Sequence, residues 1–243
     1  MIDIKEVIEN LYNVFSKYTS SNMYYCDCGC IKESDVKKLA SKKLRDLEED
    51  DFSYYHGKAT YTWGSLEHYK HFLPRVLEVH NQKKGKGLID LYDITVKLES
   101  IEWETWEQNE IDAINNFILA DWNSFINASD SEISVSDLGY YSFFFSPRYL
   151  LNQWEIAKNE NTLKKFIYFF YNYGTDLINK GLKLKDKIYK KEFIEFINQK
   201  GLIKNLENEF FRADEIDKRY AEKVSIVIQM IEQEKLFGSS LYF

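Results

Sequence analysis

The sequence predicts an all-α protein, and three observations lead to this prediction. Apolar residues recur at spacings of three and four along most of the 243-residue chain, which is the period of an amphipathic helix. The chain has only two prolines and ten glycines, so few positions would interrupt a helix. No hairpin dipeptide lies between alternating strands. We expect an irregular bundle of about eight to ten helices, with stacked helix pairs of the HEAT or armadillo kind as the alternative.

The length fits a single α-helical domain over residues 1–243. No linker rich in proline, glycine or serine divides the chain, and the only candidate for a soft division is the segment 128–147. The periodic segments follow one another in the order 4–18, 36–47, 48–59, 65–80, 90–99, 105–127, 147–157, 161–180, 186–199 and 202–236.

Helix starts in the first half are marked by capping residues. Asp3 and Glu6 form a candidate capping box for the first helix, and Ser34 is a candidate N-cap for the second. The acidic run 48–51 suits the first turn of the third helix, because carboxylates favour the positive end of a helix dipole. Loops are expected over residues 19–33 and 83–87.

A corner is expected at Trp63 and Gly64, between the third and fourth helices. Ser65 then begins the fourth helix, and Pro74 lies inside its pattern. Proline removes an amide donor and crowds the preceding turn, so Pro74 should kink the helix or split it.

The second half is rich in aromatic residues. Residues 128–147 are expected to be loop and short helix, and Pro147 fits the first turn of the helix that follows. The runs 140–145 (YYSFFF) and 166–173 (FIYFFYNY) are interpreted as core, and a break is expected near residues 212–214.

The charges are unevenly distributed. From Leu98 to Pro147 there is no lysine or arginine, and ten acidic residues occur: Glu99, Glu102, Glu104, Glu107, Glu110, Asp112, Asp121, Asp130, Glu132 and Asp137. This acidic segment could form a face that binds a basic protein, although two ordinary solvated faces would give the same pattern. A net charge of −7 without a basic stripe disfavours nucleic acid. No signal peptide or membrane span is recognisable, so we expect a cytoplasmic protein.

The only three cysteines lie at alternate positions in the sequence CDCGC. Cys26, Cys28 and Cys30 could converge on one zinc ion if Gly29 allows the loop to turn. Zinc would then need a fourth ligand, and the candidates are His56, His71 and Asp27. Reactive redox thiols and inert reduced thiols are the alternatives.

The fourth helix carries further candidates for a binding site. His71 and Arg75 lie one turn apart on the same face, and Arg75 and Glu78 are spaced for an ion pair. Trp63 would anchor the corner beside them. Structural hydrogen bonding is the alternative for each of these residues. Motifs for hydrolases, nucleotide phosphates and dinucleotides are absent, so nothing points to an enzyme.

The segment 54–80 (YYHGKATYTWGSLEHYKHFLPRVLEVH), together with the cysteines, resembles a family of uncharacterised bacterial proteins. The shared pattern is a cysteine cluster, then Thr-Trp-Gly at 62–64, then His-Phe-Leu-Pro-Arg at 71–75. The family cluster looks like C-x-C-C, so the glycine between the last two cysteines of this chain is a departure. The resemblance carries no activity, and it implies that the cysteine loop and this helix are family features.

Two functions therefore remain open. The first is a non-enzymatic protein-interaction module with an acidic face, for example an antitoxin or immunity protein that binds a basic protein. The second is a zinc-binding protein or small metalloenzyme that uses Cys26, Cys28, Cys30 and His71.

Overall fold

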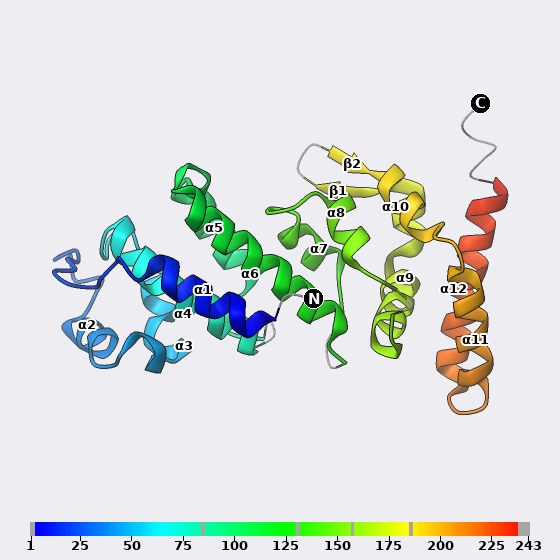
Figure 1. Cartoon of the computed structure of the whole chain (residues 1–243), viewed down its shortest axis with the longest axis horizontal. Coiled ribbons are helices and arrows are strands. Elements are labelled where there is room, and N and C mark those ends of the chain that lie inside the picture. The colour runs from blue at the N-terminus through cyan, green and yellow to red at the C-terminus, as the bar shows by residue number, and fades with distance from the viewer. Residues whose placement is uncertain (1–2, 84–85, 130–131, 157, 185–186, 238–243) are drawn as a thin grey trace. The chain divides into compact units, whose positions relative to one another are not determined.

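The computed structural model describes residues 3–83, 86–129, 132–156, 158–184 and 187–237. Within these ranges the chain forms twelve α-helices, two short 3-10 helices and one two-stranded sheet (Figure 1). The prediction of an all-α, multi-helix fold is confirmed. None of the described helices combines the length and the apolar character that a bilayer crossing requires.

The chain divides into two compact units, Met1–Asp121 and Trp122–Phe243, which we call unit 1 and unit 2. The boundary precedes the predicted soft division at 128–147. Whether the two units act as one domain stays a prediction.

Unit 1 holds the first six helices (Figure 1). Their order is α1 (Ile4–Phe15), α2 (Glu33–Ala40), η1 (Leu44–Asp46), α3 (Glu49–Lys58), α4 (Leu66–Lys83), α5 (Leu91–Ser100), η2 (Trp103–Thr105) and α6 (Gln108–Asn127), of which the residues up to Asp121 belong to this unit.

The helix boundaries agree with the capping signals at most positions. Asp3 caps α1 and accepts a hydrogen bond from the Lys5 amide at 3.0 Å. Ser34 is not the N-cap of α2, because the Asp35 carboxylate accepts from the Lys32 amide and fixes the start earlier. Pro74 lies inside α4, which is uninterrupted. Of the two predicted outcomes, a kink or a split of the helix, the split does not occur.

Unit 1 is built around α4. This helix packs against α1, α3 and η1, and α3 also packs against α2. The side chains that fill the space between these helices are large and apolar, as the helical periodicity predicted. Buried examples in unit 1 are Leu11, Phe15, Phe52, Tyr55, Tyr69, Leu73 and Leu77, together with Ile94 of α5 and Phe117 of α6.

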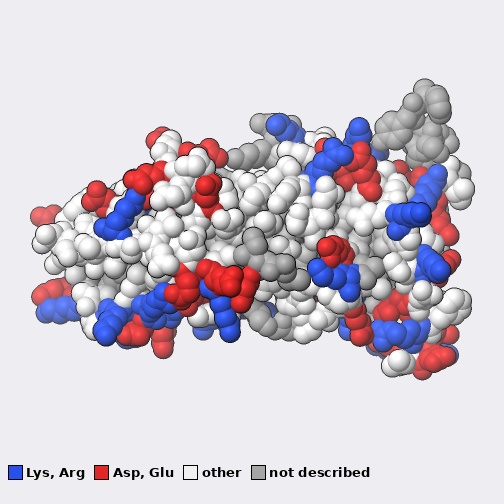
Figure 2. Space-filling model, in the orientation of Figure 1, with Lys and Arg blue, Asp and Glu red and all other residues white. Residues whose placement is uncertain are grey.

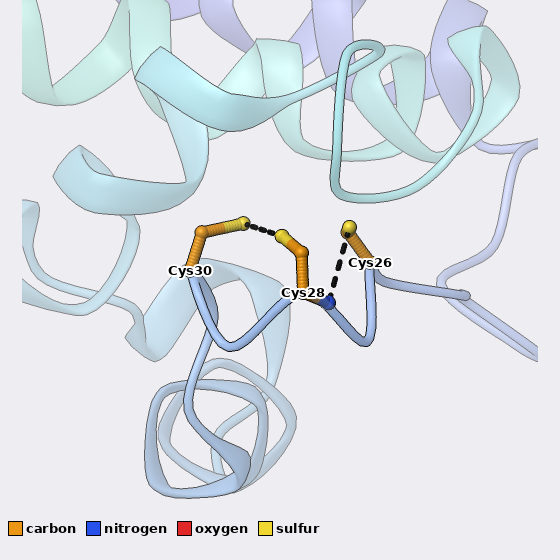
Figure 3. A group of neighbouring side chains, drawn as sticks. All are labelled: Cys26, Cys28 and Cys30. Atoms are coloured by element: carbon orange, nitrogen blue, oxygen red, sulfur yellow. Dashed lines mark hydrogen bonds between the residues drawn. The ribbon is translucent and has the colours of Figure 1, made fainter.

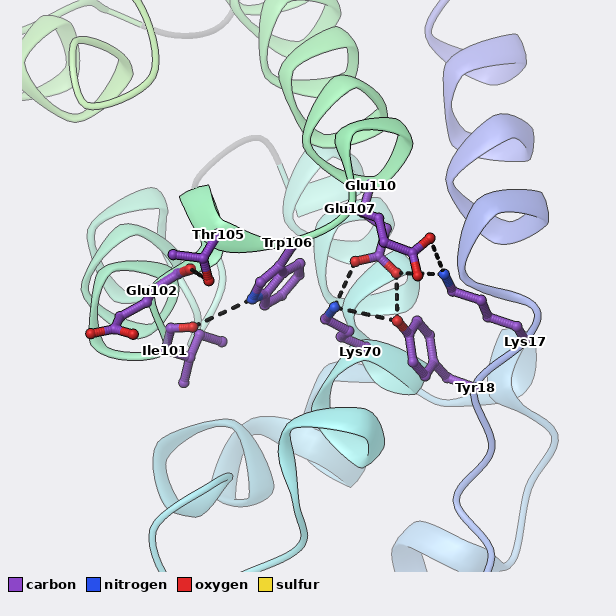
Figure 4. Close-up of polar contacts among 9 residues, drawn as sticks. All are labelled: Lys17, Tyr18, Lys70, Ile101, Glu102, Thr105, Trp106, Glu107 and Glu110. Carbon is purple, nitrogen blue, oxygen red and sulfur yellow. Dashed lines mark hydrogen bonds and ion pairs between the residues drawn. The ribbon is translucent and has the colours of Figure 1, made fainter.

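A buried ion pair joins α4 to α6. The Lys70 Nζ lies 2.6 Å from a carboxylate oxygen of Glu110 and 4.1 Å from the ring centroid of Trp106 (Figure 4). Glu110 also accepts hydrogen bonds from Tyr18 and Lys17, at 2.5 and 3.1 Å. Although burial raises the pKa of Glu110, these donors outweigh it and hold the pKa below its ordinary value.

Unit 2 holds α7 (Val135–Tyr141), α8 (Pro147–Gln153), α9 (Glu160–Lys180), β1 (Leu182–Leu184), β2 (Lys187–Tyr189), α10 (Lys190–Ile197), α11 (Leu202–Asp214) and α12 (Lys218–Phe237). Pro147 stands in the first turn of α8, as predicted. The break between α11 and α12 follows the predicted position closely. These two helices pack together, and α12 also packs on α9.

The hairpin in unit 2 corrects the sequence analysis. A helix was expected over 186–199. Residue 186 lies outside the described residues, residues 187–189 form the antiparallel strand β2, and α10 begins only at Lys190. Gly181 explains the change of direction: its φ of +74° ends α9 in a conformation that favours glycine. β1, which follows Gly181, pairs with β2 in antiparallel register.

Aromatic side chains form the core of unit 2. Trp154 contacts Phe166, Phe169 and Phe196 with ring centroids 5.7 to 6.2 Å apart. Phe170 stacks on Phe193 at 5.8 Å. The run 166–173 thus contributes to the core as expected, whereas the phenylalanines of 143–145 are only half-buried.

Candidate metal centre

The three cysteines of unit 1 lie together on one side of a short loop (Figure 3). Their Sγ atoms all lie within 4.8 Å of one another, and those of Cys28 and Cys30 are 2.9 Å apart. The Cys26 Sγ accepts a hydrogen bond from the Cys28 amide at 3.3 Å. Among the described residues this is the only group of three or more candidate metal ligands.

Gly29 turns the loop between the second and third thiols. Its φ is +82°, a conformation that side chains with a Cβ rarely adopt. The sequence predicts that Gly29 lets the thiols converge, and its conformation agrees. Cys28 is exposed to solvent, whereas Cys26 and Cys30 are half-buried.

The cysteine loop is held against the corner that precedes α4. The Cys26 amide donates to the Thr62 carbonyl at 2.8 Å, and the Gly64 amide donates to the Tyr24 carbonyl at 2.8 Å. Tyr25 and Trp63 form an antiparallel bridge between these two bonds. The Tyr54 hydroxyl, from α3, donates to the Cys30 carbonyl at the other end of the loop. Hydrogen bonds to the loop backbone therefore hold both ends of the thiol cluster, from the corner at Cys26 and from the Tyr54 side chain at Cys30.

Trp63 anchors the corner itself, as the sequence suggested. Its indole is 1% exposed and meets the ring of Tyr55 edge-on at 5.3 Å. Lys97, which comes from α5, also contacts this region and was not predicted from the sequence. The Lys97 Nζ donates to the Ala59 carbonyl at 2.8 Å and lies 4.2 Å from the ring centroid of Tyr61. Burial lowers the pKa of Lys97 to about 8. No motif marks this lysine, because its role depends on a contact 38 residues away.

The histidines of α4 fix the chain just before the cysteine loop. The His68 Nε2 lies 3.0 Å from the Ser21 carbonyl, and the His71 Nδ1 lies 3.0 Å from the Tyr18 carbonyl. Burial lowers the pKa of His71, so its neutral form is favoured. Both hydrogen bonds hold the segment that precedes the cysteines against α4.

None of the three candidates for a fourth ligand joins the thiol group. The His71 Nδ1 is directed at Tyr18, as described above, and His71 is not in the group of ligand atoms within 4.8 Å. His56 lies in the core beside the ring of Tyr69, and its side chain is buried. Asp27 lies within the loop but is exposed and also outside the group.

Arg75 and Glu78 form the ion pair that their spacing predicted, with nitrogen and oxygen 2.7 Å apart. Arg75 also donates to the Leu47 carbonyl at 2.6 Å, and Glu78 accepts from the Tyr12 hydroxyl at 2.6 Å. The pair therefore connects α1, α4 and the end of η1. A role of these residues in binding stays a prediction.

Hydrogen bonds among the thiols shift the pKa values of Cys28 and Cys30. Interactions with the side chains of Cys26 and Cys30 lower the pKa of Cys28 to about 7, and the Cys28 side chain in turn raises the pKa of Cys30. A thiolate is therefore readily available at Cys28 near neutral pH, and the thiolate is the form that binds metals.

The arrangement suits a thiophilic metal ion. Tetrahedral zinc with Zn–S bonds of ~2.3 Å places its sulfur ligands about 3.8 Å apart. The three Sγ atoms, within 4.8 Å of one another, would need only small movements to reach that geometry. Three cysteines at this spacing could hold a metal ion.

The acidic segment 98–147 does not form one surface. Glu110 and Asp121 are buried, the first with Lys70 and the second 2.6 Å from the Asn81 amide. Asp137 accepts hydrogen bonds from Ser134 at the start of α7.

On the face shown in Figure 2, acidic and basic side chains are interspersed. Asp130 lies outside the described residues. Five exposed carboxylates remain in unit 1: Glu99, Glu102, Glu104, Glu107 and Asp112.

Comparison of the chain with protein-family models, curated proteins and solved structures found no match. The resemblance to a bacterial family stays a prediction.

Proposed function

We propose that this protein binds a zinc ion through the thiolates of Cys26, Cys28 and Cys30. The observation that carries the proposal is the convergence of the three Sγ atoms within 4.8 Å on a loop held by the corner at one end and by Tyr54 of α3 at the other. Thiolates are the ligands of structural zinc sites and also select zinc over harder ions such as magnesium. A preorganised set lowers the entropy lost on binding, which favours tight association.

In this proposal the fourth position belongs to water or to an external ligand. Cys28 is exposed, so solvent reaches the cluster directly. His71 keeps its hydrogen bond to Tyr18 and is not needed as a ligand. A site with three protein ligands and an open position can exchange its external ligand, as catalytic zinc sites do.

Metal analysis of the protein purified without an affinity tag tests the proposal. We expect one equivalent of zinc in the wild type and its loss in the triple variant with Cys26, Cys28 and Cys30 all replaced by serine. His71→Ala is the matched control and should retain zinc. A wild-type protein with far less than one equivalent after zinc loading would refute the proposal. Loss of zinc in both variants would show instead that His71 is the fourth ligand.

The second candidate function is binding of a basic protein, as an antitoxin or immunity protein would. The exposed carboxylates of unit 1 favour it, because Glu102, Glu104 and Asp112 lie close in sequence with no lysine or arginine between them. Surface carboxylates would increase the association rate with a basic partner and lose their effect at high salt.

A labelled poly-lysine peptide is a suitable probe for this second function. We expect the triple variant with E102Q, E104Q and D112N to bind the peptide more weakly than a control with E207Q, E215Q and E222Q in unit 2. All six carboxylates are exposed, so the two variants differ in location and not in net charge. Equal weakening in both variants would mean that only the net charge of the protein matters, and no acidic face would then be supported.

A further inference from the structure

We infer that Cys28 and Cys30 are a redox pair whose disulfide removes the metal-binding capacity of the cysteine loop. The inference rests on the proposed zinc site for its effect on metal binding. The observation behind it is an asymmetry among the three thiols. The Sγ atoms of Cys28 and Cys30 are 2.9 Å apart, whereas Cys26 contacts the backbone amide of Cys28. The second and third cysteines are therefore the pair placed to react.

The backbone of the loop allows this bond to form. A disulfide needs Cα atoms less than about 7 Å apart and Cβ atoms directed at each other. Gly29, with its φ of +82°, folds the chain back between the two cysteines, and their side chains meet in Figure 3. A Cβ at Gly29 would meet no atom within 4 Å, so the turn leaves open space around it.

With hydrogen peroxide as the oxidant, the exposed thiol of Cys28 reacts first and the half-buried thiol of Cys30 reacts second. The Cys28 thiolate is exposed and attacks one peroxide oxygen; an S–O bond forms, the O–O bond breaks, and the leaving hydroxide takes a proton to become water. The half-buried Cys30 sulfur then attacks the Cys28 sulfur. The S–S bond forms, the S–O bond breaks, and a second water leaves. Two thiols are oxidised and one peroxide is reduced to two waters.

The disulfide would leave Cys26 as the only thiol of the loop. A disulfide sulfur is a poor ligand for zinc, because the thiolate is the form that coordinates the metal. One thiolate without its two neighbours cannot hold the ion, so oxidation should release it. Reduction by a cellular dithiol would restore the cluster, as expected for a transient disulfide in a reducing compartment.

Peroxide treatment of the zinc-free and zinc-loaded wild-type protein tests the inference. We expect a mass decrease of two hydrogens, a disulfide between Cys28 and Cys30 in the peptide map, and complete release of zinc to a chromogenic chelator. Added dithiothreitol should reverse both changes. A peptide map that shows Cys26 in the main disulfide, or a protein that resists peroxide in its zinc-free form, would overturn the inference.

Single variants separate the roles of the thiols. Cys26→Ser should form the same disulfide, since the reacting pair is intact. Cys30→Ser should accumulate a sulfenic acid at Cys28 that dimedone traps, because no neighbouring thiol resolves it. If C26S fails to form the disulfide, the proposed pairing is wrong.

A protein that forms the disulfide but binds no zinc would refute the proposed function and leave the redox pair established. A protein that keeps its zinc after the disulfide has formed would overturn the inference and leave the proposed function in place.

Discussion

Gly29 is the residue on which the shape of the cysteine loop depends. Its φ of +82° lies in the left-handed region, where a Cβ costs about 1–2 kcal/mol. Nothing lies within 4 Å of the position that a Cβ would take, so a substitution would meet backbone strain without a steric clash. The effect of a substitution should therefore be confined to the loop.

We predict that Gly29→Ala weakens zinc binding about tenfold, because about 1–2 kcal/mol of strain opposes the bound geometry. Competition with a fluorescent zinc chelator measures the affinity. Gly57→Ala is the matched control: Gly57 lies in α3, also has nothing within 4 Å, and has an ordinary φ. Alanine there should leave zinc binding unchanged and slightly stabilise the helix. Equal zinc affinities for the two variants would contradict the role given to Gly29.

His56 should make the protein sensitive to acid. Burial lowers the pKa of His56 to about 4, below the ordinary value of 6.5 that applies in the unfolded chain. As the pH falls from 6.5 to about 4, the unfolded state binds a proton that the folded state does not. The free energy of unfolding should therefore fall across this window, by up to about 3 kcal/mol.

Urea unfolding between pH 4 and pH 7 tests this prediction. His56→Leu should unfold with a flatter pH dependence than the wild type, since leucine does not titrate. Phe52→Leu, a buried substitution in the same helix, should lower the stability and keep the wild-type slope. Asp121 raises the pKa of His80 despite its burial, so protonation of His80 stabilises the folded state as the pH falls. This stabilisation is the same in all three proteins. Identical slopes for H56L and the wild type would contradict the assignment.

At the scale of elements, the ion pair between α4 and α6 depends on both of its partners. Glu110 is fully buried and Lys70 nearly so, while Lys17 and Tyr18 add further contacts to the carboxylate. Removing one member of a buried pair leaves the other charge without compensation, which typically costs about 3–5 kcal/mol.

We predict that Glu110→Gln lowers the free energy of unfolding by about 3–5 kcal/mol, because the Lys70 ammonium then stays buried beside a neutral side chain. Lys70→Met should cost less, since Lys17 and Tyr18 still contact the carboxylate. Asp176→Asn breaks an exposed pair with Lys180 and should change the stability by less than about 0.5 kcal/mol. Urea titrations of the three variants measure these differences. The prediction would fail if E110Q were as stable as D176N.

The hairpin of unit 2 shows how an element escaped prediction. Three paired residues on each strand are too few for an alternating pattern to stand out from the helical periodicity on both sides. The helix end at residue 180 was predicted, and a glycine at position 181 is typical of such an end, but nothing there predicts the strand that follows.

At the scale of the whole molecule, the candidate metal centre lies entirely within unit 1. A ligand that binds only the folded state stabilises it by mass action, by about 2.7 kcal/mol when its concentration is a hundred times its dissociation constant. The segments that are hydrogen-bonded to the cysteine loop should be stabilised most by the bound metal.

We predict that zinc slows amide hydrogen exchange in residues 24–30 and 62–64 and leaves β1 and β2 of unit 2 unchanged. The bonds from Cys26 to Thr62 and from Gly64 to Tyr24 couple the first two segments, whereas the hairpin belongs to the other unit. Exchange followed by mass spectrometry, with and without zinc, measures the effect. The triple cysteine-to-serine variant is the control and should show no response. Protection that rises equally in the hairpin would contradict a site confined to the loop.

The sequence by itself determined the helical class, most helix boundaries, the corner at Trp63 and the pairing of Arg75 with Glu78, because these features depend on periodicity and local spacing. It also identified the cysteines as a group. Only the tertiary structure decided that the thiols converge without His71, that Lys97 supports the corner, and that Glu110 is buried in a network and not part of an acidic face. The contacts of Lys97 and Glu110 join residues 38 to 92 positions apart, and no local pattern encodes which side chains will meet after the helices pack.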